Sequence, residues 1–170
     1  MPLLTKGRYR ARIASSVQDI ADAQALRTLA FATASSDRDA FDDICSHILV
    51  HDLRSGQLVC CFRMLVLEGG SDLARSYSAQ YYELSGLQSF EGRMVEMGRF
   101  CLHPDWHDPD ILRVAWGAMT SFVDANNIEM LFGCSSFAGT ETEQYLDAFA
   151  MLKYRHLGPK RWLPRVKAPD

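Results

Sequence analysis

The pattern of apolar and polar residues predicts several strands, one of which lies at the centre of the fold. Residues 8–14 alternate tyrosine, alanine and isoleucine with arginine, which is typical of an edge strand. Apolar runs over 48–53 and 58–67 flank a turn at 54–57 and predict a β-hairpin. A further apolar run over 94–104 ends in a His-Pro turn and predicts a buried strand. We expect the rest of the chain to be organised around this central strand.

Helical periodicity separates several of these strands. Ser16 followed by Asp19 predicts an amino-terminal cap for a helix over 17–32, which has one apolar face. The remaining expected elements are a short helix near 82–90, a helix over 110–126, a strand over 128–137, a helix over 141–154 and a short strand over 161–166. The order β-α-β-β-(α)-β-α-β-α-β predicts the α/β class with a mixed sheet.

Two opposite charges interrupt the central strand. Glu96 and Arg99 are three residues apart, so strict alternation would place them on opposite faces of a flat strand. Gly98 lies between them, and a glycine at such a place often marks a β-bulge, which would bring both charges to one side. Burying them is costly unless they pair or take part in chemistry. A structural ion pair and a functional site are equal alternatives at this point.

Length and composition predict a single domain. A chain of 170 residues with 48% hydrophobic content can bury a full core. No apolar run approaches the roughly 20 residues of a transmembrane helix, and residues 1–16 lack the apolar segment of a signal peptide. The five cysteines are irregularly spaced, which favours reduced thiols in a cytosolic protein.

The net charge of −3 is unevenly distributed along the chain. The two ends are basic and carry no acid over residues 1–18 and 153–167; their charged residues are Lys6, Arg8, Arg10, Arg12, Lys153, Arg155, Lys160, Arg161, Arg165 and Lys167. Such asymmetry can mark a docking surface for an acidic partner, and two solvated tails are the alternative.

Several common kinds of site are disfavoured. His103 and His107 are four residues apart, but Pro104 removes the helical face that a metal pair would use, so no metal site is expected. Cys101 beside His103 lacks the signature of a catalytic thiol. Neither a GxGxxG nor a P-loop motif is present, and no basic stripe carries interleaved aromatic residues, which argues against nucleic-acid binding.

The remaining charged residues form a pattern in the apolar elements. Arg27 and Phe31 share a face of the first helix, Asp39 and Asp42 precede the hairpin, and Arg63 interrupts its second strand. A single arginine of this kind is usually paired with a carboxylate in the core. Together with the two charges of the central strand, these residues favour a polar cleft.

The motifs R-x-x-x-F, D-x-F-D and E-x-x-R-F resemble those of acyl-homoserine-lactone synthases. The segments FDDICSHILVHD, YYELSGL, EMGRFCLHPDW, AWGAMTSFV and LFGCSSFAGT are more similar to ornithine N-acyltransferases that use acyl-acyl-carrier-protein, sometimes described as hemolysin-like, over about residues 20–155. This resemblance implies the fold of the GNAT superfamily of N-acyltransferases, in which helices flank a mixed central sheet on both faces. It also implies one domain over 1–170, shortened at its carboxyl end relative to the family.

The resemblance assigns roles to individual residues. It implies that Glu96 is the base and Arg99 a second catalytic group, and that the substrate is bound by Arg27, Phe31, Asp39, Asp42 and Arg63. An arginine could pair with the acceptor's carboxylate, and one of the loop acids could hold a second amine such as that of ornithine. Backbone N–H groups where the central strand diverges from 130–136 could bind the oxyanion.

The donor is expected to be an acyl-carrier-protein thioester, with no cofactor. In an ordinary GNAT protein a glycine-containing turn before the third helix binds the coenzyme A pyrophosphate. Here residues 106–110 contain two acids and no glycine, which disfavours coenzyme A. Carrier proteins are acidic, so we expect docking at the basic carboxyl end, on Lys153, Arg155, Lys160, Arg161 and Arg165.

The expected reaction moves a 3-hydroxyacyl group to the α-amine of ornithine and forms lyso-ornithine lipid in the cytoplasm. The lipid product suggests peripheral contact with the inner face of the membrane. One alternative is acyl-homoserine-lactone synthesis from S-adenosylmethionine. A non-catalytic relative that binds an acyl chain or a carrier protein is another.

Overall fold

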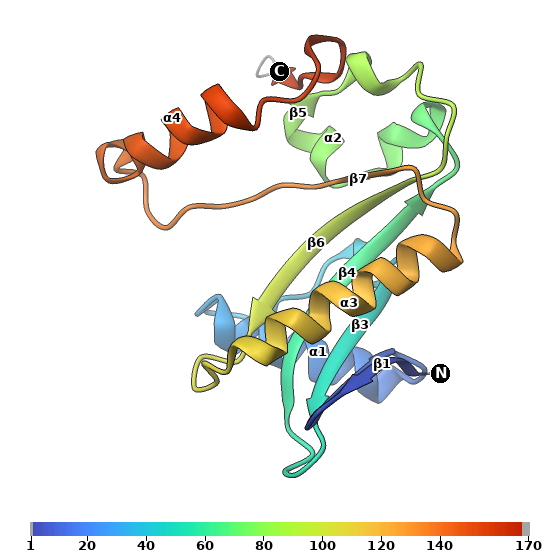
Figure 1. Ribbon diagram of the computed structural model, residues 1–170, viewed down its shortest axis with the longest axis vertical. Helices are drawn as coiled ribbons and strands as arrows, with labels where there is room; N and C mark the ends of the chain where they lie inside the picture. The colour runs from blue at the N-terminus through green and yellow to red at the C-terminus, as the bar shows by residue number, and fades with distance from the viewer. Residues whose placement is uncertain (1, 168–170) are drawn as a thin grey trace.

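The computed structural model describes residues 2–167, in which a six-stranded mixed sheet has the order β1-β2-β3-β4-β6-β7 (Figure 1). Neighbouring strands are antiparallel except β6 and β7, which are parallel. The strands are β1 (Pro2–Lys6), β2 (Tyr9–Ile13), β3 (Ser46–Asp52), β4 (Leu58–Leu67), β6 (Met94–Leu102) and β7 (Met130–Phe132). This architecture confirms the predicted α/β class with a mixed sheet.

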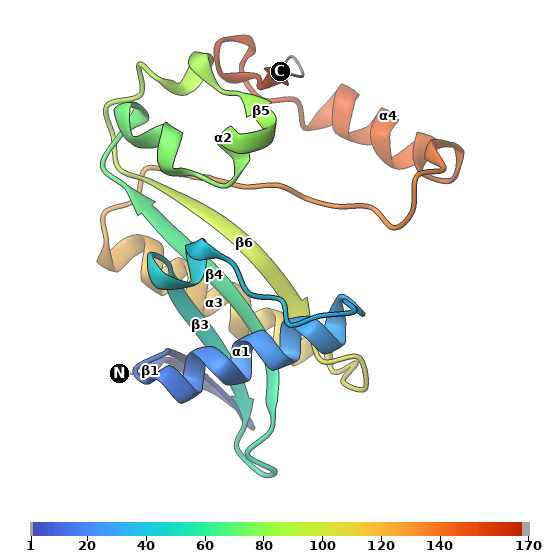
Figure 2. The ribbon, with the colours of Figure 1, turned by 180° about the vertical axis from the view of Figure 1, so that it is seen from behind.

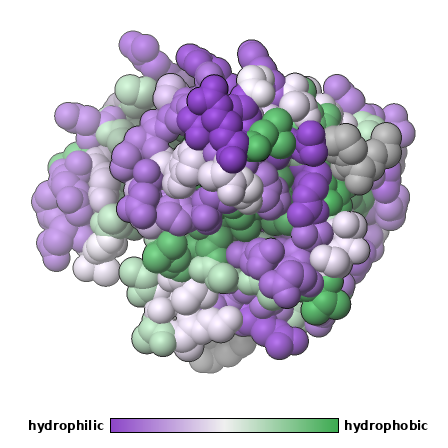
Figure 3. All heavy atoms as spheres, turned by 90° about the horizontal axis from the view of Figure 1, so that it is seen from below, coloured by the Kyte–Doolittle hydropathy of each residue, from purple (hydrophilic) through white to green (hydrophobic). Residues whose placement is uncertain are grey.

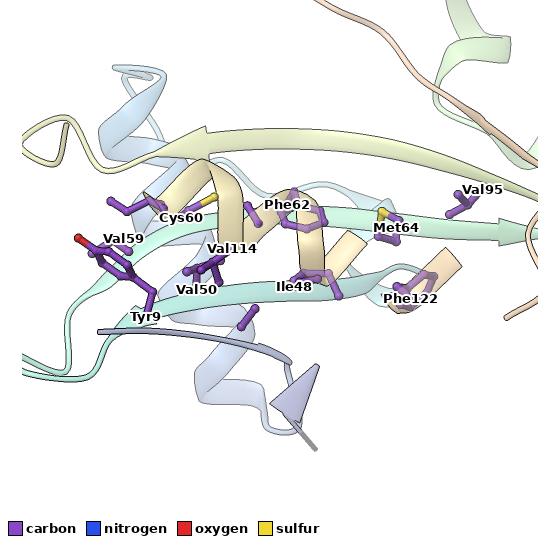
Figure 4. Packing of buried hydrophobic residues seen from close by; sticks show 14 residues of the cluster. Tyr9, Ile48, Val50, Val59, Cys60, Phe62, Met64, Val95, Val114 and Phe122 are labelled. Atoms are coloured by element: carbon purple, nitrogen blue, oxygen red, sulfur yellow. The ribbon is translucent and has the colours of Figure 1, made fainter. Parts of the chain in front are cut away.

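Helices cover both faces of the sheet, as predicted. Helix α3 (Pro109–Ala125) lies on one face (Figure 1), and α1 (Val17–Ala30) lies on the other (Figure 2). The core between α3 and the sheet includes Phe62, Val114 and Phe122 (Figure 4). Because β4 is covered on both faces, it reads as an apolar run, broken at Arg63, instead of an alternating one.

The helix starts follow the capping signals of the sequence. Ser16 caps α1, since its hydroxyl accepts a hydrogen bond from the Asp19 amide at 3.1 Å. Asp108 caps α3, whose first residue is Pro109, a residue favoured at that position. Both helices begin and end within two residues of their predicted bounds.

The predicted hairpin is present as β3 and β4, but the predicted edge strand is not at an edge. Strand β2 pairs with β3 on one side and with β1 on the other. The short β1 has no clear alternation of apolar and polar residues from which a strand could have been predicted. Gly7, with a φ of 59°, forms the turn between β1 and β2, and only glycine adopts this conformation freely.

The predicted bulge in β6 is confirmed. Cys61 lies opposite Cys101 and Arg63 opposite Gly98, so Phe62 faces two residues of β6. The residue with left-handed backbone is Arg99, at a φ of 52°, and Gly98 does not have a positive φ. The extra residue reverses the alternation of β6 and places the Arg99 side chain on the α1 face.

The chain beyond the sheet departs most from the prediction. The expected helix near 82–90 is wrong: the structure has α2 (Ser78–Tyr81), β5 (Tyr82–Glu83) and a 3₁₀ helix at Ser85–Leu87. Strand β7 has three residues where the sequence predicts ten. The predicted last helix and strand are present as α4 (Leu146–Arg155) and β8 (Arg165–Val166). Strand β8 pairs with β5 in a small second sheet.

Helix α4 lies away from the main sheet, at the end of a long extended segment (Figure 1). None of its residues is buried. At the opposite end, which carries the β3–β4 turn, the surface is mostly hydrophilic with a band of hydrophobic atoms across its middle (Figure 3). Within residues 2–167, no helix has the length and hydropathy needed to cross a membrane.

Candidate active site

A network of three arginines and three aspartates lies on the α1 face of the sheet. Helix α1 provides Arg27, β4 provides Arg63 and β6 provides Arg99; the segment between α1 and β3 provides Asp37, Asp39 and Asp42. The charges are equal in number, so the network is neutral. The sequence prediction named all of these residues except Asp37.

The inner part of the network is closed to solvent. Two nitrogens of Arg27 donate to the two carboxylate oxygens of Asp42 at 2.7 and 2.9 Å, and the Arg27 side chain is 1% exposed. Gln24 and Arg63 also donate to Asp42, each at 2.9 Å. Arg27 and Asp42 therefore hold the scaffold together, and neither has a surface to offer a substrate.

Burial and hydrogen bonding act in opposite directions on the Asp42 carboxyl. Burial raises its pKa, but the hydrogen bonds from Arg27 and Gln24 and the charge of Arg27 outweigh burial and hold the pKa well below its usual range. The pKa of Asp39 is also lowered: burial opposes the change, and the Arg63 guanidinium causes it.

These shifts predict the acid stability of the fold. Because the folded-state pKa of Asp42 lies below the unfolded value of about 3.9, its contribution is fully present above that pH and is lost as the pH falls through the folded value. We expect the free energy of unfolding, measured with urea from pH 7 to pH 2, to fall below about pH 4. Asp42→Asn should flatten this dependence, whereas Asp124→Asn, at an exposed position of α3, should not; equal slopes in all three proteins would contradict the role of the network.

The outer part of the network reaches solvent. Asp39 binds Arg63 through both carboxylate oxygens, at 2.5 and 3.1 Å, and its side chain is 27% exposed. The Arg99 side chain is 31% exposed, and its Nη2 lies 3.6 Å from Asp39 Oδ2. The rings of Phe31 and Tyr77 lie 6.0 and 5.5 Å from the Arg99 guanidinium carbon. Arg99 is thus the arginine of the network that can meet a ligand.

Glu96 does not pair with Arg99 and is held instead by a separate segment. Its Oε1 accepts from the backbone N–H and the hydroxyl of Ser78 at 2.7 and 2.5 Å, and its Oε2 accepts from the Tyr77 N–H at 2.7 Å. The residue is 5% exposed. A carboxylate oxygen has two lone pairs, so these bonds occupy Oε1 and leave one lone pair on Oε2. Glu96 is therefore fixed in place with one acceptor position remaining.

Ser78 connects Glu96 with a cavity. Its hydroxyl lies 3.2 Å from the Cys134 sulfur, and both residues line a cavity of about 710 Å³. The other lining residues come from 82–90, β7 with its flanks, and 158–164, and most are apolar: Leu84, Leu87, Phe90, Met130, Phe132 and Trp162 are among them. Neither Ser78 nor Cys134 was predicted. Ser78 lies outside every predicted element and Cys134 lies within the strand predicted over 128–137; the sequence carries no signal that a serine would meet the central strand.

The Ser78 hydroxyl should contribute to turnover by orienting Glu96. We expect Ser78→Ala to lower kcat about tenfold with little change in KM, since one charge-assisted hydrogen bond is lost while the amide bond remains. Ser76→Ala is the matched control, because its hydroxyl bonds Leu73 and Ala79 and does not contact Glu96. Equal kinetics of the two variants would remove Ser78 from the site.

Strands β6 and β7 separate beside Glu96. Their parallel pairing runs from Met94 to Glu96 on β6 and ends opposite Phe132. Gly133 follows, and a β-carbon there would overlap the Met97 carbonyl oxygen. The absent side chain lets the two backbones approach closely at the point where they part. Backbone groups and the Glu96 carboxylate therefore meet at one opening of the sheet.

The start of α3 is already occupied by a carboxylate. Asp108 accepts from the Asp110 N–H at 2.9 Å and from the Tyr9 hydroxyl at 2.7 Å. Burial and the hydrogen bond to Asp108 raise the pKa of Tyr9 to about 12. A pyrophosphate at this helix end would meet the Asp108 charge. That this turn disfavours coenzyme A stays a prediction.

The basic residues near the carboxyl end are exposed. Lys153 and Arg155 lie on α4, Lys160 and Arg161 in a 3₁₀ helix, and Arg165 on β8. At the other end, by contrast, Arg8 pairs with Asp52 and Arg12 with Asp19, at 2.5 and 2.6 Å, so that end is partly neutralised. Docking at the carboxyl end stays a prediction.

Among the described residues, no cluster of three or more histidine, cysteine or acidic side chains is placed to hold a metal ion.

Comparison with solved structures agrees with this fold. FeeM, an N-acyl amino acid synthase from uncultured soil microbes, matches with a TM-score of 0.56 and 14% identity, covering 89% of this chain and 78% of that one. The AHL synthase LasI matches with a TM-score of 0.52 and 16% identity over 72% and 70% of the two chains. At these identities the likeness concerns the fold.

Curated relatives give a sequence-level match. The L-ornithine N(alpha)-acyltransferase of Rhodobacter capsulatus is 28% identical over 94% of this chain and 68% of its own length. Three more relatives with the same name are 25–29% identical, and the chain spans 54–60% of their length. The family model described as the acetyltransferase (GNAT) domain matches residues 24–117, which include the second half of α1, the hairpin and the central strand. The chain therefore belongs to the GNAT acetyltransferase family.

Proposed function

We propose that this protein transfers an acyl group, such as a 3-hydroxyacyl group, from acyl carrier protein to the α-amine of ornithine, with lyso-ornithine lipid as the product. The four relatives named L-ornithine N(alpha)-acyltransferase support the reaction. In this chain the observation that carries it is a partly exposed charge pair, Arg99 and Asp39, with the buried carboxylate of Glu96 on the same strand as Arg99.

The charge pair is complementary to an amino acid that carries a second amine. The Arg99 guanidinium would bind the acceptor's carboxylate, and the exposed edge of Asp39 would bind the side-chain ammonium. Three buried residues hold this charge pair in place. Arg63 hydrogen-bonds Asp39 and fixes its position, and the pair formed by Arg27 and Asp42 fixes Arg63. The Phe31 ring lies within cation–π distance of the Arg99 guanidinium, which favours the charged side chain at this position.

Glu96 is suited to act as the base. The acceptor's α-ammonium must lose a proton, and the remaining lone pair of Oε2 accepts it directly or through a water. The nitrogen then bonds to the thioester carbonyl carbon. Collapse of the tetrahedral intermediate breaks the C–S bond, and the proton that the nitrogen loses as it becomes an amide passes to the departing sulfur, so the carrier protein leaves as its thiol. Backbone N–H groups near Gly133, where β6 and β7 part, are the candidate donors to the oxyanion.

The cavity beside Ser78 is suited to bind a long acyl group. Its volume is about 710 Å³ and its wall is largely apolar, so an alkyl chain bound there would be shielded from water. Burial of each methylene contributes about 0.8 kcal/mol to such binding. Because Ser78 and Cys134 line this cavity and Ser78 bonds Glu96, the reacting carbon of a chain bound there would lie near Glu96.

The proposed acyl donor, acyl carrier protein, can be tested by reversing charges at the expected docking surface. The charge of Asp108 at the start of α3 disfavours coenzyme A, and the exposed basic residues suit an acidic carrier protein. We expect the reversal Lys160→Glu with Arg161→Glu to raise the KM for acyl carrier protein at least tenfold, and added salt to raise it in the unchanged protein. The control is Arg54→Glu in the exposed β3–β4 turn. Equal use of acetyl-coenzyme A would overturn the choice of donor.

A panel of acceptors tests the reaction itself. The purified protein is supplied with 3-hydroxyacyl-acyl carrier protein, and thiol release is followed with ornithine, norvaline or S-adenosylmethionine. Norvaline is ornithine without the side-chain amine, so ornithine should react faster if Asp39 binds that amine. A lactone formed from S-adenosylmethionine would support the acyl-homoserine-lactone alternative. Carrier-protein binding without thiol release would support a non-catalytic role.

A further inference from the structure

Two cysteines face each other across the central strands. Cys61 on β4 and Cys101 on β6 are register partners, and their sulfur atoms lie 3.5 Å apart. We infer that Cys61 and Cys101 form a reversible disulfide, which makes this pair a redox modification site distinct from the acyl-transfer site.

The backbone geometry permits the bond without moving the strands. Directly opposed residues of antiparallel strands have Cα atoms about 4.5–5.5 Å apart, within the range of about 4.4–6.8 Å in disulfides. The bulge at Arg99 creates this arrangement, because it turns Cys101 to the α1 face, where Cys61 already lies. Cys60 points the other way, toward α3 (Figure 4).

The environment favours one thiol as the first to react. A hydrogen bond from the Cys61 thiol and the nearby charge of Arg27 lower the pKa of Cys101, although burial opposes this shift. With a peroxide as oxidant, the Cys101 thiolate attacks one oxygen, the O–O bond breaks and, with one proton taken up, a sulfenic acid and water form. The Cys61 sulfur then bonds to the Cys101 sulfur, its proton leaves with the hydroxyl group as water, and the disulfide is complete.

A small oxidant has a short path to the pair. Cys61 and Cys101 are 1% and 5% exposed, and they share a cluster with Leu26 and Leu58. These two leucines also line a cavity of about 340 Å³ that includes His51. Movement of one leucine side chain would therefore bring a molecule the size of a peroxide to the cysteines.

Peptide mapping tests the inference. The folded protein is treated with hydrogen peroxide, its remaining thiols are alkylated after unfolding, and it is digested with trypsin. We expect the peptide 55–63, which contains Cys60 and Cys61, to be linked to the peptide 100–113, which contains Cys101. The linked form should have two fewer alkylated thiols, and a reductant should restore both. The link closes a 40-residue separation and should raise the unfolding temperature by about 5 °C or more.

Matched variants identify the partners. Cys60→Ser should keep the link, and Cys61→Ser should remove it. Exposed Cys134 reports that the oxidant has acted. Oxidation of Cys134 while 55–63 and 100–113 stay unlinked in the wild-type protein would overturn the inference, and this result does not depend on any variant folding. A link that persists in Cys61→Ser would assign the bond to Cys60 and would also overturn it.

Discussion

Glu96→Gln should lower kcat for ornithine acylation by about 10²-fold or more. The glutamine keeps the size of the side chain and its oxygen can accept from Ser78, but its NH₂ group cannot accept from the Tyr77 N–H, so one of the three bonds to the segment at 77–78 is lost. The amide has no lone pair basic enough to take the proton of the acceptor's ammonium. The loss should therefore appear in the chemical step, with KM for the carrier protein unchanged.

Single-turnover kinetics with 3-hydroxyacyl-acyl carrier protein separate this effect from binding. Glu91→Gln, at an exposed position just before β6, is the matched control and should keep full activity. Thermal unfolding of both variants shows whether the fold is kept. Turnover by Glu96→Gln equal to that of the wild type would remove Glu96 as the base.

Arg27→Met should destabilise the fold by about 3–5 kcal/mol, because it leaves the buried carboxylates of Asp42 and Asp37 without their main partner. This would be a large part of the 5–15 kcal/mol that stabilises a typical domain. The measurement is urea unfolding at pH 7. Arg38→Met, at an exposed position of the same region, should change stability by less than about 0.5 kcal/mol. A loss below about 1 kcal/mol in Arg27→Met would show that the network does not support the site.

The elements that sequence predicts well are those with a local signal. The apolar runs that flank the turn at 54–57 indicate the hairpin, and Ser16 caps the start of α1 as predicted. The glycine within the central strand indicates a bulge. It does not indicate that the next residue, Arg99, takes the left-handed conformation.

The parts that sequence does not reveal depend on distant contacts. Glu96 is held mainly by backbone N–H groups of 77–78, and every residue type except proline offers such a group. Helical spacing shows that Arg27 and Phe31 share a face but not that one is buried and the other exposed. The partners that bury Arg27 come from a loop whose path no periodicity describes. Residue types at the site could therefore be predicted, whereas their division into scaffold and binding surface could not.

The most direct test of the proposed reaction is to locate the new bond in the product. Purified protein is incubated with 3-hydroxyacyl-acyl carrier protein and ornithine labelled with ¹⁵N at the α-position, and the product is fragmented in a mass spectrometer. The site geometry predicts an amide on the labelled nitrogen, since Arg99 and Asp39 would hold the acceptor's carboxylate and side-chain amine. An amide on the unlabelled nitrogen, or no acylated ornithine while the donor is consumed, would contradict it.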